Sequence, residues 1–158
     1  MEPEAPQFTT STLTRVAGCE AVTLRAWRNR NGLFPETAGK QGWNRFSLVD
    51  VCIARTVVLM TASGIAAGEA IWFAEMYLRT PFKLAHSKDL DGDLSGIVAF
   101  APKDASDTAT FRLYVKPQDV LNTISEFGGL VTLLDLNLIH AHVLAGLKAV
   151  AEPHKGDA

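Results

Sequence analysis

The first part of the chain carries apolar residues at helical spacing. A short helix over residues 10–17 is predicted by three apolar residues at i, i+3 and i+4: Leu13, Val16 and Ala17. Its start has three candidate hydroxyl caps: Thr10, Ser11 and Thr12. Gly18 ends this helix, and a second helix is predicted over residues 21–31, where Asn31 and Gly32 suit a helix C-terminus. Two short helices joined by a glycine-containing turn predict a helix-turn-helix.

Residues 33–47 break this pattern. Pro35, Gly39 and Gly42 are incompatible with a continuing helix, so a loop or small hairpin is predicted, with aromatic and basic residues near its return arm. A hairpin beside the second helix would be the wing of a winged helix-turn-helix.

Two longer helices are predicted next. Ser47 as N-cap and Asp50 three residues later predict a capping box before a helix that ends at Gly64. Its expected inner face has six residues: Leu48, Val51, Cys52, Ala54, Val58 and Leu59. A further helix over residues 66–80 should be closed by Pro81, because proline disrupts a helix interior. Its apolar residues include Ile71, Trp72, Met76 and Leu78.

After Pro81 the pattern changes to polar residues, glycines and aspartates, which predict a linker over residues 80–95. Strands and helices are then predicted in a second unit: strands within 96–102 and 110–117, a helix within 118–129, a strand within 130–136 and a helix within 138–152. Asp135 or Asn137 would cap the last helix. We therefore expect a mainly α winged helix-turn-helix domain over residues 8–79 and a small α+β domain over residues 96–152 for dimerisation or sensing.

Composition fits this division. The chain has 158 residues, of which 47% are hydrophobic, enough for one or two small domains with real cores. Its formal net charge is -2, yet bases outnumber acids in residues 8–60, whereas acids outnumber bases from Thr80 onward. A polyanion is therefore expected to favour the N-terminal part. No run approaches the roughly 18 apolar residues of a membrane span, and the acidic start does not resemble a signal peptide, so a cytoplasmic, nucleoid-associated location is expected.

Several short motifs follow one another in order through residues 8–79. They are Thr23-Leu24-Arg25, Trp27, Gly32-Leu33, residues 42–47 ("GWNRFS"), Asp50 and Gly64. In order and spacing they resemble the DNA-binding domain of the MerR family of bacterial transcription regulators, which carries "TLR", a Gly-Leu-Leu stop, a "GYR-x-Y-S" wing and a long helix. "TLRAW" is most similar to the subgroup with "TLRAWERRYGLL", which includes cobalamin-using light-responsive repressors. Nothing after residue 80 resembles a cobalamin domain.

The chain departs from the family pattern at two places. Asn44 stands where the wing motif has arginine, with Arg45 beside it. Family dimers form through a long helix directly after the domain, whereas Pro81 is expected to interrupt the chain here. Dimerisation is therefore assigned to the helix near residues 137–151.

The candidate site is a DNA-binding surface on the second helix and the wing. Arg25 and Arg45 are predicted to anchor phosphates, while Thr23 and Arg28 are expected to face outward and contact bases. The resemblance implies that Trp27 and Trp43 replace family tyrosines that lie close to the DNA backbone, although Trp27 equally suits a core position. The full set comprises Thr23, Arg25, Trp27, Arg28, Arg30, Lys40, Trp43, Asn44 and Arg45. For the basic members the alternative is a solvated charged face.

Other chemistry is weakly represented. Asp89, Asp91 and Asp93 alternate like calcium ligands, but Leu94 and Phe100 occupy the Gly and Glu positions of an EF-hand loop. Two cysteines, Cys19 and Cys52, lack zinc-site spacing and should be buried. His140 and His142 point to different helix faces. No catalytic motif is recognisable, so neither an enzyme nor a metal or cofactor is expected.

These patterns favour a sequence-specific DNA-binding transcription regulator that acts as a homodimer on a roughly palindromic operator. The expected partners are double-stranded DNA and a second copy of the chain, with RNA polymerase as a further candidate and no membrane. Two alternatives remain open. One is an architectural or excision-type factor that bends DNA, and the other is an anti-repressor or adaptor that binds a protein partner.

Overall fold

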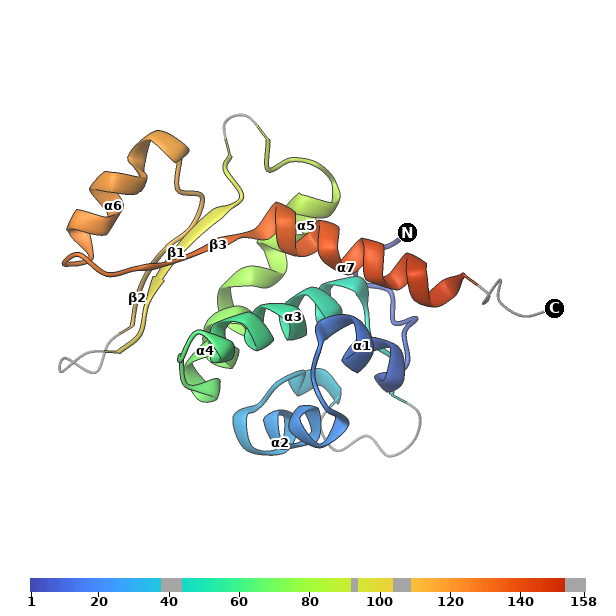
Figure 1. Cartoon of the computed structure of the whole chain (residues 1–158). Coiled ribbons are helices and arrows are strands. Elements are labelled where there is room, and N and C mark those ends of the chain that lie inside the picture. Colours follow the sequence, from blue (N-terminus) through green and yellow to red (C-terminus); the bar gives the residue numbers. More distant parts are fainter. Residues whose placement is uncertain (38–43, 92–93, 104–108, 153–158) are drawn as a thin grey trace. The chain divides into compact units, whose positions relative to one another are not determined.

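The chain is mainly helical and contains a small three-stranded antiparallel sheet (Figure 1). The computed structural model describes four stretches: residues 1–37, 44–91, 94–103 and 109–152. The chain divides into two compact units. One unit contains Met1–Arg79 and the chain from Ile139 onward, and the other contains Thr80–Leu138. Most of the last helix thus groups with the N-terminal residues, whereas the sequence pattern placed it in the C-terminal domain.

The first two helices form as predicted. α1 (Thr10–Ala17) and α2 (Ala21–Asn31) end at Gly18 and Gly32, whose φ angles of 83° and 73° lie in the left-handed region. The cap of α1 is Thr9, however, whose side chain accepts a hydrogen bond from the Thr12 N–H at 3.2 Å. Thr9 follows a β-bridge between Phe8 and Phe46, which leads the backbone into α1 in the extended conformation that an N-cap requires.

The segment after α2 begins with a 3₁₀ turn, Pro35–Thr37. The tip of the predicted wing, including Lys40 and Trp43, lies outside the described residues. The structure resumes with Asn44, Arg45 and Phe46, and the ring of Phe46 packs against Phe34 with centroids 5.1 Å apart.

The capping box of α3 (Leu48–Ala62) is confirmed. The Ser47 N–H donates to the Asp50 carboxylate at 2.8 Å, and the Asp50 N–H donates to the Ser47 hydroxyl at 3.1 Å. The predicted inner face is wrong at Val58 and Leu59, which are only half-buried. It also omits five residues that are buried: Val49, Ile53, Thr56, Val57 and Met60. A helix that is apolar on most sides is buried by neighbours on more than one side, so a single stripe cannot describe it.

The prediction that Pro81 closes the fourth helix is wrong. α4 (Ala67–Phe73), a π-helical turn η2 (Ala74–Leu78) and α5 (Arg79–His86) follow one another without a break. In an α-helix the ring of Pro81 would crowd the carbonyl of Tyr77, four residues earlier. The wider π turn contains Tyr77 and relieves this crowding. The helix also extends into the predicted linker, whose non-helical part starts only after His86.

The second unit contains the sheet, with strand order β2-β1-β3. The predicted strands are confirmed as β1 (Ile97–Ala101), β2 (Thr110–Arg112) and β3 (Thr132–Asp135). In the central strand, Phe100 is fully buried opposite Phe111 and Thr132. A 3₁₀ turn η3 (Pro117–Asp119) leads into α6 (Val120–Glu126), and Glu126 forms an ion pair with Arg112 of β2.

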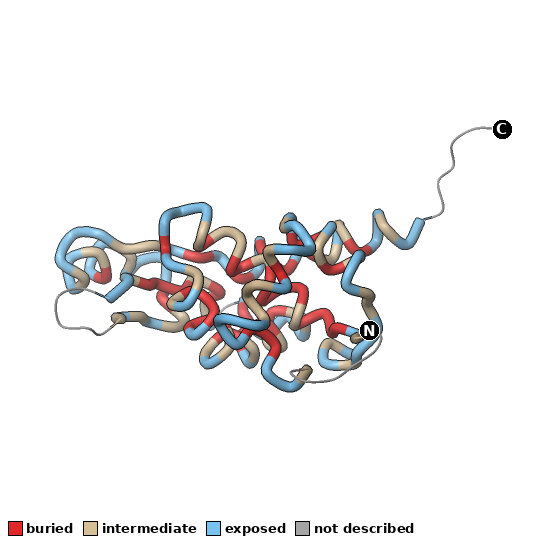
Figure 2. The backbone as a smooth tube through the Cα atoms, turned by 90° about the horizontal axis from the view of Figure 1, so that it is seen from below, coloured by how far each residue is buried: buried red, intermediate tan, exposed pale blue. Residues whose placement is uncertain are grey.

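The last helix, α7 (Leu136–Ala151), is capped by Asp135, whose carboxylate accepts a hydrogen bond from the Leu138 N–H at 3.1 Å. Asn137, the other predicted cap, instead donates to the Leu90 carbonyl at 2.9 Å. The helices carry both buried and exposed residues (Figure 2). On α7 the buried residues are Leu136, Ile139, His140, Val143 and Leu147. The apolar face expected to form the dimer is therefore occupied within the chain.

Gly146 allows α7 to approach α1 closely. A Cβ at this position would lie 2.9 Å from a methyl carbon of Val16. We expect Gly146→Ala to lower the free energy of unfolding by about 1 kcal/mol, because the clash outweighs the better helix propensity of alanine. Urea unfolding would measure this change.

Gly68 of α4 provides the matched control, because a Cβ there would meet nothing closer than 3.4 Å. Gly68→Ala should stabilise the protein by about 0.5 kcal/mol. In a Val16→Ala background the cost of Gly146→Ala should disappear. An unchanged cost in that background would show that the two residues do not meet.

Candidate nucleic-acid interface

The arginines of the first unit fall into two groups. Three are held by hydrogen bonds within the fold: Arg28, Arg55 and Arg79. Four are exposed and have no partner among the residues that the structure describes: Arg15, Arg25, Arg30 and Arg45. This division decides which guanidinium groups are available to a ligand.

Arg28 is half-buried, and its guanidinium group is bonded within the fold. Its Nη2 donates to the Thr37 hydroxyl at 2.7 Å and to the Thr37 carbonyl at 3.4 Å. Its guanidinium also lies over the ring of Phe46, 5.5 Å from the centroid, a cation–π geometry. Arg28 follows the buried Leu24 by four residues and so shares its helix face. Arg28 therefore does not face outward as expected, and its contact with bases stays a prediction.

Arg55 secures the end of α1. Its Nη1 donates to the Ala17 carbonyl at 3.2 Å, one of the carbonyls that a helix C-terminus leaves without an intrahelical partner. The positive charge also interacts favourably with the negative end of the α1 dipole. Arg55 thereby joins α1 to α3.

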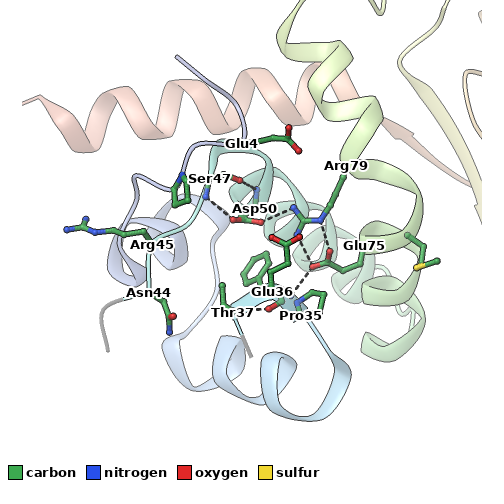
Figure 3. Close-up of a pocket in the computed structure, with 13 residues that line it drawn as sticks. Glu4, Pro35, Glu36, Thr37, Asn44, Arg45, Ser47, Asp50, Glu75 and Arg79 are labelled. Carbon is green, nitrogen blue, oxygen red and sulfur yellow. Dashed lines mark hydrogen bonds and ion pairs between the residues drawn. The ribbon is translucent and has the colours of Figure 1, made fainter. Parts of the chain in front are cut away.

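Arg79 connects three segments (Figure 3). Its Nε and Nη2 donate to the two oxygens of Glu75 at 2.7 and 3.1 Å, and its Nη1 donates to Asp50 at 2.9 Å. The same Glu75 carboxylate accepts the Phe34 N–H at 2.9 Å. Phe34 has a φ of 55°, unusual for a residue with a bulky side chain. The Glu75 hydrogen bond and the burial of the Phe34 ring hold this conformation.

Burial acts to lower the pKa of Arg79. The hydrogen bond and charge of Glu75, followed by those of Asp50, outweigh this effect and raise the pKa above its usual value. Arg79 is therefore charged at neutral pH. Removing its guanidinium would leave two carboxylates that are only 17% and 11% exposed without a counter-charge.

A pocket of about 600 Å³ lies beside this network. Its charged lining residues are mostly acidic: Glu4, Glu36, Asp50 and Glu75 with Arg45 and Arg79. Arg45 points away from the Arg79 network (Figure 3). The pocket is thus unsuited to phosphate groups, and the exposed arginines are the better anion-binding groups of this unit.

The predicted site residues divide in the same way. Arg25, Arg30 and Arg45 are exposed, as a contact with DNA requires. Asn44, Thr23 and Trp27 are half-buried, so each remains partly accessible. The sequence interpretation did not include Arg15 among the site residues, although it is an exposed arginine of the same unit. Its position outside the apolar spacing of α1 indicates this exposure.

The remaining candidates offer little chemistry. Cys52 is buried as expected and Cys19 is half-buried; burial raises the pKa of both thiols, and the charge of Glu20 adds to this effect at Cys19. His140 is buried and His142 is exposed, on different faces of α7.

Comparison with protein-family models and with curated protein sequences finds no match for this chain. Among the described residues, none of the helices combines the length and apolarity needed to span a bilayer. Within the same stretches of chain, no group of three or more His, Cys, Asp or Glu residues is placed to hold a metal ion.

Arg79→Ala should lower the free energy of unfolding by about 2–3 kcal/mol, because it leaves Asp50 and Glu75 partly buried and uncompensated. Urea denaturation would measure this change. Arg30→Ala removes an equally charged but exposed residue and should cost less than about 0.5 kcal/mol. Equal costs for the two variants would contradict a structural role for Arg79.

Arg28→Ala should cost about 1–2 kcal/mol, because the Thr37 hydrogen bond and the packing on Phe46 are removed. Arg25→Ala, three residues earlier on the same helix, is the matched control and should lie within about 0.5 kcal/mol of the native protein. Thermal unfolding of both variants tests the assignment. If Arg25→Ala were destabilised and Arg28→Ala were as stable as the native protein, the roles assigned to the two arginines would have to be exchanged.

Proposed function

We propose that the protein is a sequence-specific DNA-binding transcription regulator that acts as a homodimer, with α1 and α2 as the helix-turn-helix of a winged domain. The observation that carries this proposal is the exposed face of α2. It presents Arg25 and Arg30 to solvent, while the other arginine of the helix, Arg28, is used to hold the fold together.

The connection between the two helices supports the same function. Only Gly18, Cys19 and Glu20 separate α1 from α2, as in a helix-turn-helix, whose second helix usually enters the major groove. Arg45 on the return arm of the proposed wing supplies another exposed cation. The resemblance of residues 8–79 to MerR-family domains adds to this geometry. The motif residues that the structure describes lie on α2 and directly after it, at residues 44–47 and near both ends of α3.

Two copies would place two α2 helices in successive major grooves of a roughly palindromic site. The buried face of α7 packs within the chain, so the dimer would use other residues. Affinity would come mainly from phosphate neutralisation and would fall steeply with salt. Three exposed arginines, Arg25, Arg30 and Arg45, would bind phosphates on each protomer.

Selection of binding sites from a randomised duplex library, at two salt concentrations, tests the proposal. The native protein should enrich one inverted repeat. The Arg25→Ala plus Arg30→Ala variant should no longer enrich it, and the dependence of log affinity on log salt should weaken by about one for each phosphate that the variant cannot neutralise. These exposed residues can be changed without disturbing the Arg28 and Arg79 hydrogen bonds.

Lys116→Ala plus Lys148→Ala removes the same charge from exposed positions outside α1 and α2 and should bind as the native protein does. Absence of DNA binding by the native protein would overturn the proposal and favour the adaptor alternative. Binding that bends the site without any effect on transcription would favour the architectural alternative.

A further inference from the structure

The outward face of α2 has an uncharged centre. Three residues lie along it at i, i+4 and i+7: Val22, Ala26 and Asn29. The side chain of Val22 is an exposed large hydrophobic group, with 68% of the residue accessible, and Asn29 is also exposed. By helical geometry, Arg25 and Arg30 lie on opposite sides of this line.

Two residues on the opposite face of α2 are not available to a ligand, whereas Ala26 is half-buried and remains accessible. Leu24 is fully buried and Arg28 is bonded to Thr37, so the face that they share is turned inward. Trp27 is half-buried on the inner side of Arg30. Whatever the helix contacts with its outward face must therefore meet methyl groups and one carboxamide between two guanidinium groups.

These side chains have a specific complement in the major groove. Valine and alanine side chains cannot form hydrogen bonds, but they can pack against the C5-methyl group that only thymine presents there. The asparagine carboxamide pairs with adenine through two hydrogen bonds: its oxygen accepts from N6–H, and its NH₂ group donates to N7. Both preferences select A·T base pairs.

The dimensions of the helix agree with such a contact. Val22 and Asn29 are separated by seven residues, which corresponds to about 10 Å along a helix and hence to about three base pairs. The arginines beside this line would face the phosphates of the groove walls.

We propose that Val22, Ala26 and Asn29 select A·T base pairs at the centre of each half-site, while Arg25 and Arg30 hold the flanking phosphates. This inference rests on the proposed DNA-binding function. In this proposal Val22, Ala26 and Asn29 contact the bases in place of Arg28. None of the three is charged, so the charge pattern of the sequence does not point to them.

The test uses the duplex selected by the native protein, with thymine in one half-site replaced by deoxyuridine, which lacks only the C5-methyl group. Affinity should fall about fourfold for each methyl group that packs against the protein in the native complex. Val22→Ala should bind the thymine duplex several-fold more weakly and should lose part of its discrimination against the deoxyuridine duplex. The methyl groups that remain at positions 22 and 26 should preserve the rest. Leu121→Ala, a truncation at a position that is 79% exposed in the second unit, should retain the full discrimination.

A second arm replaces adenine by 7-deazaadenine, which lacks the N7 acceptor. The native protein should bind this duplex more weakly, whereas Asn29→Ala should bind both duplexes equally. Because Val22 and Asn29 are exposed, both variants should fold as the native chain does, which circular dichroism would verify.

The outcomes separate the inference from the function on which it rests. If the native protein bound the selected site equally well with and without the thymine methyl groups and the adenine N7, the inference would be overturned. The proposed function as a transcription regulator would remain. A selected half-site without central A·T pairs would do the same. Failure of the native protein to bind any duplex would overturn both.

Discussion

The fold of the N-terminal unit depends on the charge of Arg79. This side chain joins Asp50, which caps α3, to Glu75 of the π turn, and Glu75 in turn holds the backbone of Phe34 directly after α2. Each carboxylate also accepts a backbone hydrogen bond besides forming the ion pair: Asp50 accepts the Ser47 N–H of the capping box, and Glu75 accepts the Phe34 N–H. Charges that are two-thirds or more buried are stable only when they are paired and hydrogen-bonded. The network therefore ties the start of α3, the π turn and the backbone that follows α2 to one another.

The same principle separates the arginines that build the domain from those that are available to DNA. Arg28, Arg55 and Arg79 satisfy their guanidinium groups with Thr37, Ala17 and the two carboxylates. These three guanidinium groups are thereby engaged within the protein. The outward face of α2 retains two arginines, one on each side of an uncharged centre. A surface of this kind combines groups for phosphate attraction with groups that distinguish bases, which are the two requirements of specific recognition. The pocket beside the Arg79 network has a mostly acidic charged lining, and Arg45 at its edge points away from that network.

The helical run from α4 to α5 shows how a local rule is overridden. A proline has no backbone N–H to donate, and its ring crowds the carbonyl of the residue four positions earlier. Both effects act on the helical turn that precedes the proline. In this chain that turn is π-helical, and it also carries Glu75, which must reach both Arg79 and Phe34. The packing of buried Phe73, Leu78 and Phe82 on this run further opposes a break. α7 is likewise determined by packing, since the absence of a side chain at Gly146 allows Val16 to approach it.

Local chemistry by itself determined the ends of most elements, because caps and glycines act within a few residues: Gly18 and Gly32 end α1 and α2, and Ser47 with Asp50 starts α3. It also predicted the three strands and identified Arg25, Arg30 and Arg45 as exposed candidates. Only the tertiary structure decided what depends on distant neighbours. It turned Arg28 inward to Thr37, moved the cap of α1 to Thr9, carried the helix through Pro81 and packed α7 against α1. Periodicity and charge specify which faces can be buried, but the interactions that actually bury them form between residues far apart in the chain.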